Sequence, residues 1–252
     1  MIPNPIRQVL FTIQASGTRT LLMGGQACVF YGAAQVSRDV DFLILAEVAN
    51  FKKLHEALAT LMAKRIAVPP FDAALLERGH AVHYRCTAPG VEGLRIDLMS
   101  KLRDLSSFEI LWERRTVIGD GAGNEFDLLS VPDLVSAKKT QRSKDWPVID
   151  ALVSIHFREN GASPEADWID FWLSEARSAE LLVDLTHRFV SETVRLELKR
   201  PLLALARAEN LPELRAALDA EVRAEQDKDR LYWEPLKLEM EQFRRAERGS
   251  NA

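Results

Sequence analysis

Cysteine, long apolar runs and an excess of positive charge are all scarce in this sequence of 252 residues. Its two cysteines, Cys28 and Cys86, have no metal-ligand spacing, so we expect both to be reduced and structural, and we expect no zinc site. The formal net charge of -4 excludes a general basic field, so a nucleic-acid contact would need a local patch. No apolar run approaches the ~18 residues of a membrane span, and the N-terminus lacks a basic segment followed by an apolar stretch. We therefore expect a cytoplasmic protein.

Glycine and proline are also few, at 12 and 11 residues, while 47% hydrophobic and 28% charged residues are typical of a globular chain. Strand patterns occur only in the first part of the chain, and from Pro132 onward the periodicity is helical. We therefore predict an α+β domain over residues 1–141, with a mixed sheet flanked by helices, and an all-helical domain over 142–252. Breaks between the later helices are predicted at Gly161–Pro164, Pro201, Asn210–Pro212 and near Asp227–Asp229.

A glycine pair opens the most informative stretch of the chain. Leu21-Leu22-Met23 is typical of a short buried strand, and Gly24-Gly25 allows the backbone to turn sharply after it. A helix is expected next, and the N–H groups of its first turn would point at an anion over the glycines, for which a triphosphate is the obvious candidate. Other helices are predicted over 5–16 and, with Asn50 as the N-cap, over 51–62.

Two acids begin the following strand, Asp39-Val40-Asp41-Phe42-Leu43-Ile44. Because Asp39 and Asp41 are two residues apart, both carboxylates point to the same side of an extended strand. Like charges repel unless a cation lies between them, and oxygen ligands at this spacing suit Mg²⁺ that carries the phosphates of a nucleotide. A solvated strand end is the plain alternative, and it is at least as common for an Asp-x-Asp pair that stands alone.

A third acid, Asp97, follows on a later strand. Alternation over residues 94–99 places Asp97 and Arg95 on one face, and a turn connects this strand to an earlier one over 81–87. We expect Asp97 to face the same cleft as the first two acids, and the combination favours a metal site. His83, on the earlier strand, could reach that cleft, and the remaining histidines show no pairing pattern. A second hairpin is predicted, with strands near 116–118 and 126–129 and a glycine-rich turn over 119–124.

The order of a glycine pair, a helix, Asp-x-Asp at the head of a strand and a third Asp on a later strand resembles the nucleotidyltransferase superfamily with the DNA polymerase β-like core. Within that superfamily, Asp133-Leu134-Val135-Ser136-Ala137-Lys138, continuing to Arg142-Ser143-Lys144-Asp145, is similar to the abortive-infection (AbiEii-like) toxin branch of bacterial nucleotidyltransferases. The resemblance covers roughly the first 150 residues and leaves the helical part largely unmatched.

This resemblance implies an enzyme that uses Mg²⁺ or Mn²⁺ to transfer an NMP group from an NTP to a hydroxyl of RNA, protein or a small molecule. It assigns the nucleotide phosphates to Gly24, Gly25 and Ser37, the metal to Asp39, Asp41 and Asp97, activation of the acceptor also to Asp97, and a supporting role to Lys138 and Asp145. In the toxin branch, tRNA would be the leading acceptor and an antitoxin the expected partner.

One position departs from the family pattern. Relatives often have an Arg four residues before the first Asp and a Thr two residues before it, whereas this chain has Gln35 and Ser37. Serine keeps a hydroxyl, but Gln35 removes a fixed positive charge near the site. This departure motivates a second hypothesis, a nucleotide-binding or partner-binding protein of the same fold with little turnover. A third is an antibiotic-modifying nucleotidyltransferase, which shares the core chemistry.

Several of these residues also have plain structural readings. Lys138 and Asp145 could be charged positions on a solvated helix face, although Lys138, Lys139, Arg142 and Lys144 together form the best local phosphate-binding patch of the sequence. The tryptophans after residue 140, including Trp233, are most simply core of the helical part, with base stacking as the alternative.

Overall fold

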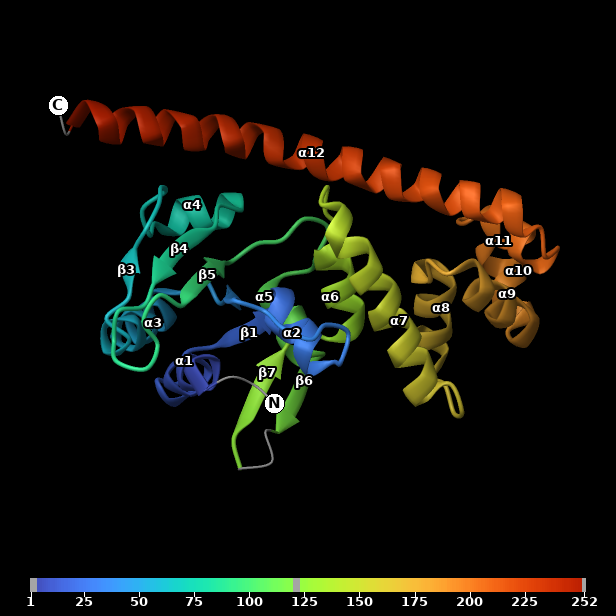
Figure 1. Cartoon of the computed structure of the whole chain (residues 1–252), viewed down its shortest axis with the longest axis horizontal. Coiled ribbons are helices and arrows are strands. Elements are labelled where there is room, and N and C mark those ends of the chain that lie inside the picture. Colours follow the sequence, from blue (N-terminus) through green and yellow to red (C-terminus); the bar gives the residue numbers. More distant parts are fainter. Residues whose placement is uncertain (1–3, 120–122, 251–252) are drawn as a thin grey trace. The chain divides into compact units, whose positions relative to one another are not determined.

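A computed structural model of the chain describes residues 4–119 and 123–250. It is an α+β structure, with a mixed sheet of seven strands flanked by helices and a helical region later in the chain (Figure 1). The chain divides into two compact units. Unit 1 contains the described residues up to Phe30, Ala34–Ala137 and those from Tyr232 onward; unit 2 contains Tyr31–Ala33 and Lys138–Leu231. Within the described ranges, none of the helices combines the length and apolar character that crossing a membrane requires.

The sheet of unit 1 has the order β3-β4-β5-β2-β1-β7-β6. Its strands are β1 Thr20–Met23, β2 Asp39–Ile44, β3 Lys64–Arg65, β4 Val82–Arg85, β5 Arg95–Met99, β6 Thr116–Gly119 and β7 Glu125–Leu128. All six predicted strands are confirmed, and the two-residue β3 was not predicted. Strands β1 and β2 are antiparallel, β2 and β5 parallel, and β4 antiparallel to β5. The predicted hairpin of β6 and β7 is also confirmed, although residues 120–122 of its glycine-rich turn lie outside the described residues.

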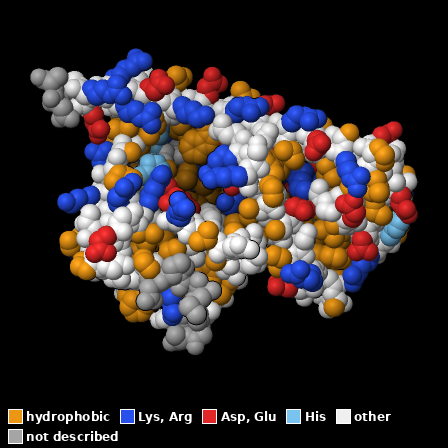
Figure 2. Space-filling view, viewed as in Figure 1, with side chains coloured by type: hydrophobic (Ala, Val, Ile, Leu, Met, Phe, Trp, Pro, Cys, Tyr) orange, Lys and Arg blue, Asp and Glu red, His pale blue; other side chains and the backbone are white. Residues whose placement is uncertain are grey.

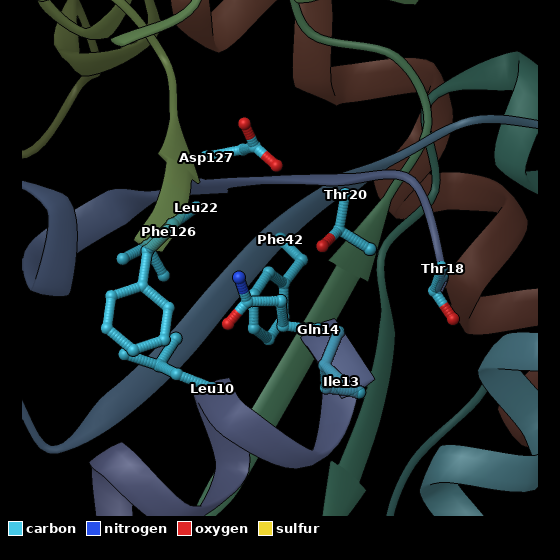
Figure 3. A pocket seen from close by; sticks show the side chains of 9 residues that line it. All are labelled: Leu10, Ile13, Gln14, Thr18, Thr20, Leu22, Phe42, Phe126 and Asp127. Atoms are coloured by element: carbon cyan, nitrogen blue, oxygen red, sulfur yellow. The ribbon is translucent and has the colours of Figure 1, made fainter. Parts of the chain in front are cut away.

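The sheet has one apolar face and one charged face at its centre. Val40, Phe42, Ile96 and Leu98 alternate with the acids of β2 and β5 and are at most 3% exposed. Helix α1, Asn4–Ala15, packs on this apolar face, where it encloses a cavity of about 30 Å³ with Phe42 and other side chains (Figure 3). A volume of this size holds roughly one water molecule, so the cavity is a packing gap and no substrate site.

The remaining helices of unit 1 are α2 Gly24–Phe30, α3 Val48–Thr60, α4 Ala73–Arg78, α5 Phe108–Glu113 and α6 Val131–Lys138, of which only the last residue, Lys138, belongs to unit 2. The prediction that Asn50 caps α3 is wrong, because the helix begins two residues earlier. The Asn50 side chain is buried and bonds instead to the backbone of Arg19 and Leu45. Helix α6 begins at Val131, and the Oγ of the preceding residue, Ser130, accepts the backbone N–H of Asp133.

Unit 2 is helical, as predicted for this part of the chain. It contains a short 3₁₀ helix at Ser143–Asp145, α7 Trp146–Asn160, α8 Ala166–Glu175, α9 Ala179–Arg188, α10 Val190–Leu196, α11 Leu202–Arg207 and the first part of α12 Leu211–Ser250. The predicted break near Asp227–Asp229 is wrong, because α12 continues through it. Its charges are compatible with a helix: Lys228 pairs with Glu225, and Asp229 accepts the backbone N–H of Gln141.

The boundary between units also differs from the prediction. It lies between Ala137 and Lys138, and the last part of α12 belongs to unit 1 instead of the helical unit. There, Leu236 is 7% exposed, His80 Nε2 lies 2.7 Å from a carboxylate oxygen of Glu239, and Arg65 Nη2 lies 3.0 Å from one of Glu247. Trp233 is therefore not in the core of the helical unit. Hydrophobic period shows that residues 231–245 form a helix, but it does not identify the partner of that helix.

Candidate active site

The three candidate acids lie on adjacent parallel strands of unit 1. The register places Asp41 opposite Asp97, and Asp97 opposite His83, so that these residues form a row across β2, β5 and β4. Asp39 stands opposite Arg95 in the next row on the same face. Because neighbouring strands are about 4.8 Å apart, the row brings three polar side chains together from segments distant in sequence. Asp97 thus faces the same side of the sheet as Asp39 and Asp41.

Asp97 is already paired with side chains of its own face. Its Oδ1 lies 2.7 Å from Arg95 Nε and 2.8 Å from His83 Nδ1. We assign the imidazole proton of His83 to Nδ1, because an ionised carboxylate only accepts hydrogen bonds and so needs an N–H donor. Arg95 Nη2 lies 3.0 Å from this Nδ1 because both side chains donate to the same oxygen, Asp97 Oδ1. Burial would raise the pKa of Asp97, but hydrogen bonds from His83 and Arg95 outweigh it and lower the pKa below its ordinary value.

Arg95 provides positive charge among the acids. Its hydrogen bond to Asp97 raises its pKa, burial opposes that effect, and the charges of Asp97, Asp39 and Asp41 raise it further. The guanidinium therefore interacts electrostatically with all three carboxylates. Sequence alternation placed Arg95 on the face of Asp97 but did not indicate that the two side chains bond.

The glycine pair makes room for this site. A Cβ on Gly24 would lie 2.8 Å from the Cβ of Asp41 and closer still to its carboxylate, and Gly24 has a φ of +67°. A Cβ on Gly25 would lie 2.6 Å from Ser37 Oγ, whose hydroxyl donates to the backbone carbonyl of Asp39. Only glycine combines this left-handed conformation with such a close approach. The pair therefore lets Asp41 and Ser37 pack directly against the turn after β1.

The carboxylates suit a hard cation chemically, since Mg²⁺ prefers oxygen ligands. The side chains as they stand do not bring three or more His, Cys, Asp or Glu groups into a metal-holding cluster within residues 4–119 and 123–250. The Gly24 cradle fixes Asp41 against the turn, and Asp39 shares its face. These two acids could hold a metal as they stand, whereas Asp97 would have to exchange its contacts with Arg95 and His83 to contribute an oxygen ligand.

Lys138 and Asp145 form a separate buried pair in unit 2. They are 8% and 3% exposed, and Lys138 Nζ lies 3.3 Å from Asp145 Oδ1. Asp145 Oδ2 also accepts from Thr140 Oγ1 at 2.6 Å and from Arg142 Nε at 2.8 Å. Burial would raise the pKa of Asp145, but the charge of Lys138, the Thr140 hydrogen bond and Arg142 lower it. The solvated helix face considered for these residues is wrong, because both are buried.

Gln26 is a further residue that sequence reasoning did not single out. It follows the glycine pair in α2 and is 1% exposed. Neither atom of its amide makes a hydrogen bond to the residues that the structure describes. A buried amide without partners costs free energy, so a water or a ligand that bonded to it would stabilise the site. Gln35, the residue that departs from the family pattern, is exposed.

Comparison with known proteins adds no assignment to this geometry. No protein-family model matches the chain, and a search of curated proteins finds no match to it.

Proposed function

We propose that this chain is a metal-dependent nucleotidyltransferase of the DNA polymerase β-like superfamily, with an AbiEii-like catalytic half. The observation that carries the proposal is the row of Asp41 and Asp97 on neighbouring parallel strands, with Asp39 on the same face and Gly24 against the Asp41 carboxylate. In this proposal Mg²⁺ or Mn²⁺ binds to Asp39, Asp41 and Asp97. The nucleotide phosphates lie over Gly24, Gly25 and Ser37, and Lys138 and Asp145 have a supporting role.

The proposed reaction is transfer of an NMP group. A hydroxyl oxygen of the acceptor attacks the α-phosphorus of an NTP, the bond from that phosphorus to the bridging oxygen breaks, and pyrophosphate leaves with the electron pair. Divalent metal, when bound, stabilises the attacking and leaving oxygens together. In this proposal Asp97 receives the hydroxyl proton at a carboxylate oxygen. The acceptor in this proposal is a hydroxyl of RNA, with tRNA first, or of protein, and an antitoxin is the proposed partner.

A second candidate function is nucleotide binding with little turnover. It is favoured by the contacts of Asp97, whose Oδ1 is held by both Arg95 and His83. Because Arg95 and His83 already offset the charge of this carboxylate, a metal ion would stabilise it less. Gln35 also lacks the positive charge of the Arg that relatives often have at its position. An antibiotic-modifying nucleotidyltransferase would use the same acids, and resistance on expression without growth arrest would identify it.

The test is incubation of the purified chain with labelled NTPs, Mg²⁺ and total RNA or cell lysate. We expect label to be incorporated by the wild type and to fall at least a hundredfold in Asp41→Asn. The control is Asp219→Asn, an exposed acid on α12 of unit 2, which should transfer label as the wild type does. Tight NTP binding with no transfer to any acceptor would support the second candidate. Equal transfer by Asp41→Asn and the wild type would contradict the proposed site.

A further inference from the structure

A pocket beside the acid row is not used by the proposed chemistry. It has a volume of about 320 Å³ and lies within unit 1, between the start of β4 and the last part of α12. His80, Ala81 and His83 form one wall. Because His83 stands opposite Asp97, the pocket begins one strand beyond the third acid. Its volume is at the lower end of the range for small-molecule sites, about 300 to 1,000 Å³.

The other wall is a single stripe of α12. It consists of Trp233, Leu236, Lys237, Met240, Glu241 and Arg244, which recur at intervals of three and four residues on one helix face. Figure 2 shows a recess beneath this part of the helix, with hydrophobic and histidine side chains inside it and Lys and Arg side chains on its rim. The wall therefore offers an aromatic ring, aliphatic groups and cations to the same space.

The charges of the stripe favour an anionic ligand. Among the described residues, no ion pair is formed by Lys237 or Arg244, whereas the acid of the stripe, Glu241, lies 3.9 Å from Arg245. His80, on the facing wall, is held by Glu239 at 2.7 Å. Two cations without an acidic partner thus face a pocket that also contains Trp233. An indole offers a stacking surface to a planar ring, and a lysine one helical turn away, about 6 Å along the axis, can bind a phosphate.

We propose that this pocket binds a nucleoside phosphate, with the base stacked on Trp233 and the phosphate bound by Lys237 and Arg244. The identification of the ligand as a nucleotide rests on the proposed function. The aromatic and cationic lining of the pocket, which indicates an aromatic anion, is independent of it. Because the proposed function places the phosphates of the donor NTP over the glycine pair and Ser37, a ligand whose phosphate is bound by Lys237 and Arg244 is a nucleotide of the acceptor. The pocket lies at the His83 end of the row, whereas Gly24 packs against Asp41 at the opposite end, and this separation favours the acceptor.

The test uses AMP as the probe, without divalent metal, and isothermal titration of the full chain. Wild type should bind AMP saturably, Trp233→Ala should weaken binding about tenfold or more, and Trp233→Phe should retain most of it, because base stacking is the lost contribution. Lys237→Gln should weaken AMP severalfold but leave binding of adenosine, which lacks the phosphate, unchanged. Arg248→Gln, on the same helix but outside the pocket, is the matched control and should bind as wild type does.

Two outcomes would overturn the pocket: no saturable AMP binding by the wild type, or unchanged binding in both Trp233→Ala and Lys237→Gln. Circular dichroism of each variant distinguishes misfolding from loss of the ligand contact. Lys237→Gln is the substitution with less effect on folding, because Lys237 is exposed. Simultaneous binding of AMP and Mg-NTP would support the assignment of the pocket to the acceptor, and competition between them would contradict that assignment. Absence of label transfer with AMP binding intact would contradict only the proposed function. Transfer without any effect of the pocket variants on AMP would contradict only the pocket.

Discussion

At the scale of single residues, Gly24 has the tightest steric requirement of the candidate site. Its positive φ excludes most side chains, and the space where a Cβ would lie is filled by Asp41. Gly-Gly turns are common for reasons of backbone alone, but here the absent side chain also sets the position of a candidate metal ligand.

Comparison of two glycines separates these effects. Gly93 has a φ of +78°, similar to the +67° of Gly24, but a Cβ on it would meet nothing within 4 Å. We expect Gly93→Ala to lower the free energy of unfolding by about 1–2 kcal/mol through backbone strain. Gly24→Ala should cost more and should also weaken Mn²⁺ binding at least tenfold, because Asp41 must move. Urea unfolding and isothermal titration with Mn²⁺ measure the two effects. Equal stability losses with unchanged Mn²⁺ binding would show that the Asp41 contact is unimportant.

At the scale of elements, the segment that joins α6 to α7 is held by one carboxylate. Asp145, in the 3₁₀ helix, accepts bonds from Lys138 at the end of α6 and from Thr140 and Arg142 in the connection. The indole of Trp146 adds a bond to the carbonyl of Thr140. This arrangement gives Lys138 and Asp145 a structural role that is independent of any role in transfer.

We expect Asp145→Asn to lower the free energy of unfolding at neutral pH by about 3–5 kcal/mol, because Lys138 is left buried without its counter-ion. The folded pKa of Asp145 is lowered, so its stabilising contribution is present above the ordinary value of 3.8 and is lost as pH falls through the folded pKa. The difference between wild type and Asp145→Asn should therefore shrink below about pH 4. Urea unfolding at a series of pH values measures it. A difference that did not change with pH would exclude ionisation of Asp145 as its source.

At the scale of the whole molecule, each unit has its own hydrophobic core. Leu98 in β5 and Leu182 in α9 are both 0% exposed, and they belong to unit 1 and unit 2 respectively. The three proposed metal ligands, Asp39, Asp41 and Asp97, and the proposed AMP pocket are all in unit 1. The affinities for Mn²⁺ and for AMP should therefore depend on the stability of unit 1 and not on that of unit 2.

These two leucines form a matched pair for that expectation. Each Leu→Ala change should cost about 2–5 kcal/mol, since both remove the same buried atoms. Leu98→Ala should raise hydrogen exchange in β2 and β5 and weaken Mn²⁺ and AMP binding at temperatures near its unfolding transition. Leu182→Ala should raise exchange in α8, α9 and α11 and leave both affinities unchanged. Hydrogen-exchange mass spectrometry resolves the segments. Equal loosening of both units by either variant would show that they unfold together.

Local patterns were sufficient for much of this molecule. A period of two residues predicted that Asp39 and Asp41 share a face of β2 and that Arg95 shares a face with Asp97, because alternation follows from strand geometry. Helical period and the break at Gly161–Pro164 predicted the helices on either side of Gly161. Charged residues such as those at Asp227–Asp229 were misread as a break, because polarity alone does not end a helix.

What required the three-dimensional fold was every relation between distant segments. The pairing of Asp41 with Asp97 depends on strand order, the bond from His83 to Asp97 on register, and the burial of Lys138 with Asp145 on packing in unit 2. The membership of Trp233 in unit 1 depends on which surface α12 meets. Sequence periodicity records which face of an element is buried but carries no information on its partner, because many apolar surfaces could cover the same face. The acid strand and the face shared by Arg95 and Asp97 were therefore readable from the chain alone, whereas the bonds from Arg95 and His83 to Asp97 and the pocket beyond them were decided by tertiary packing.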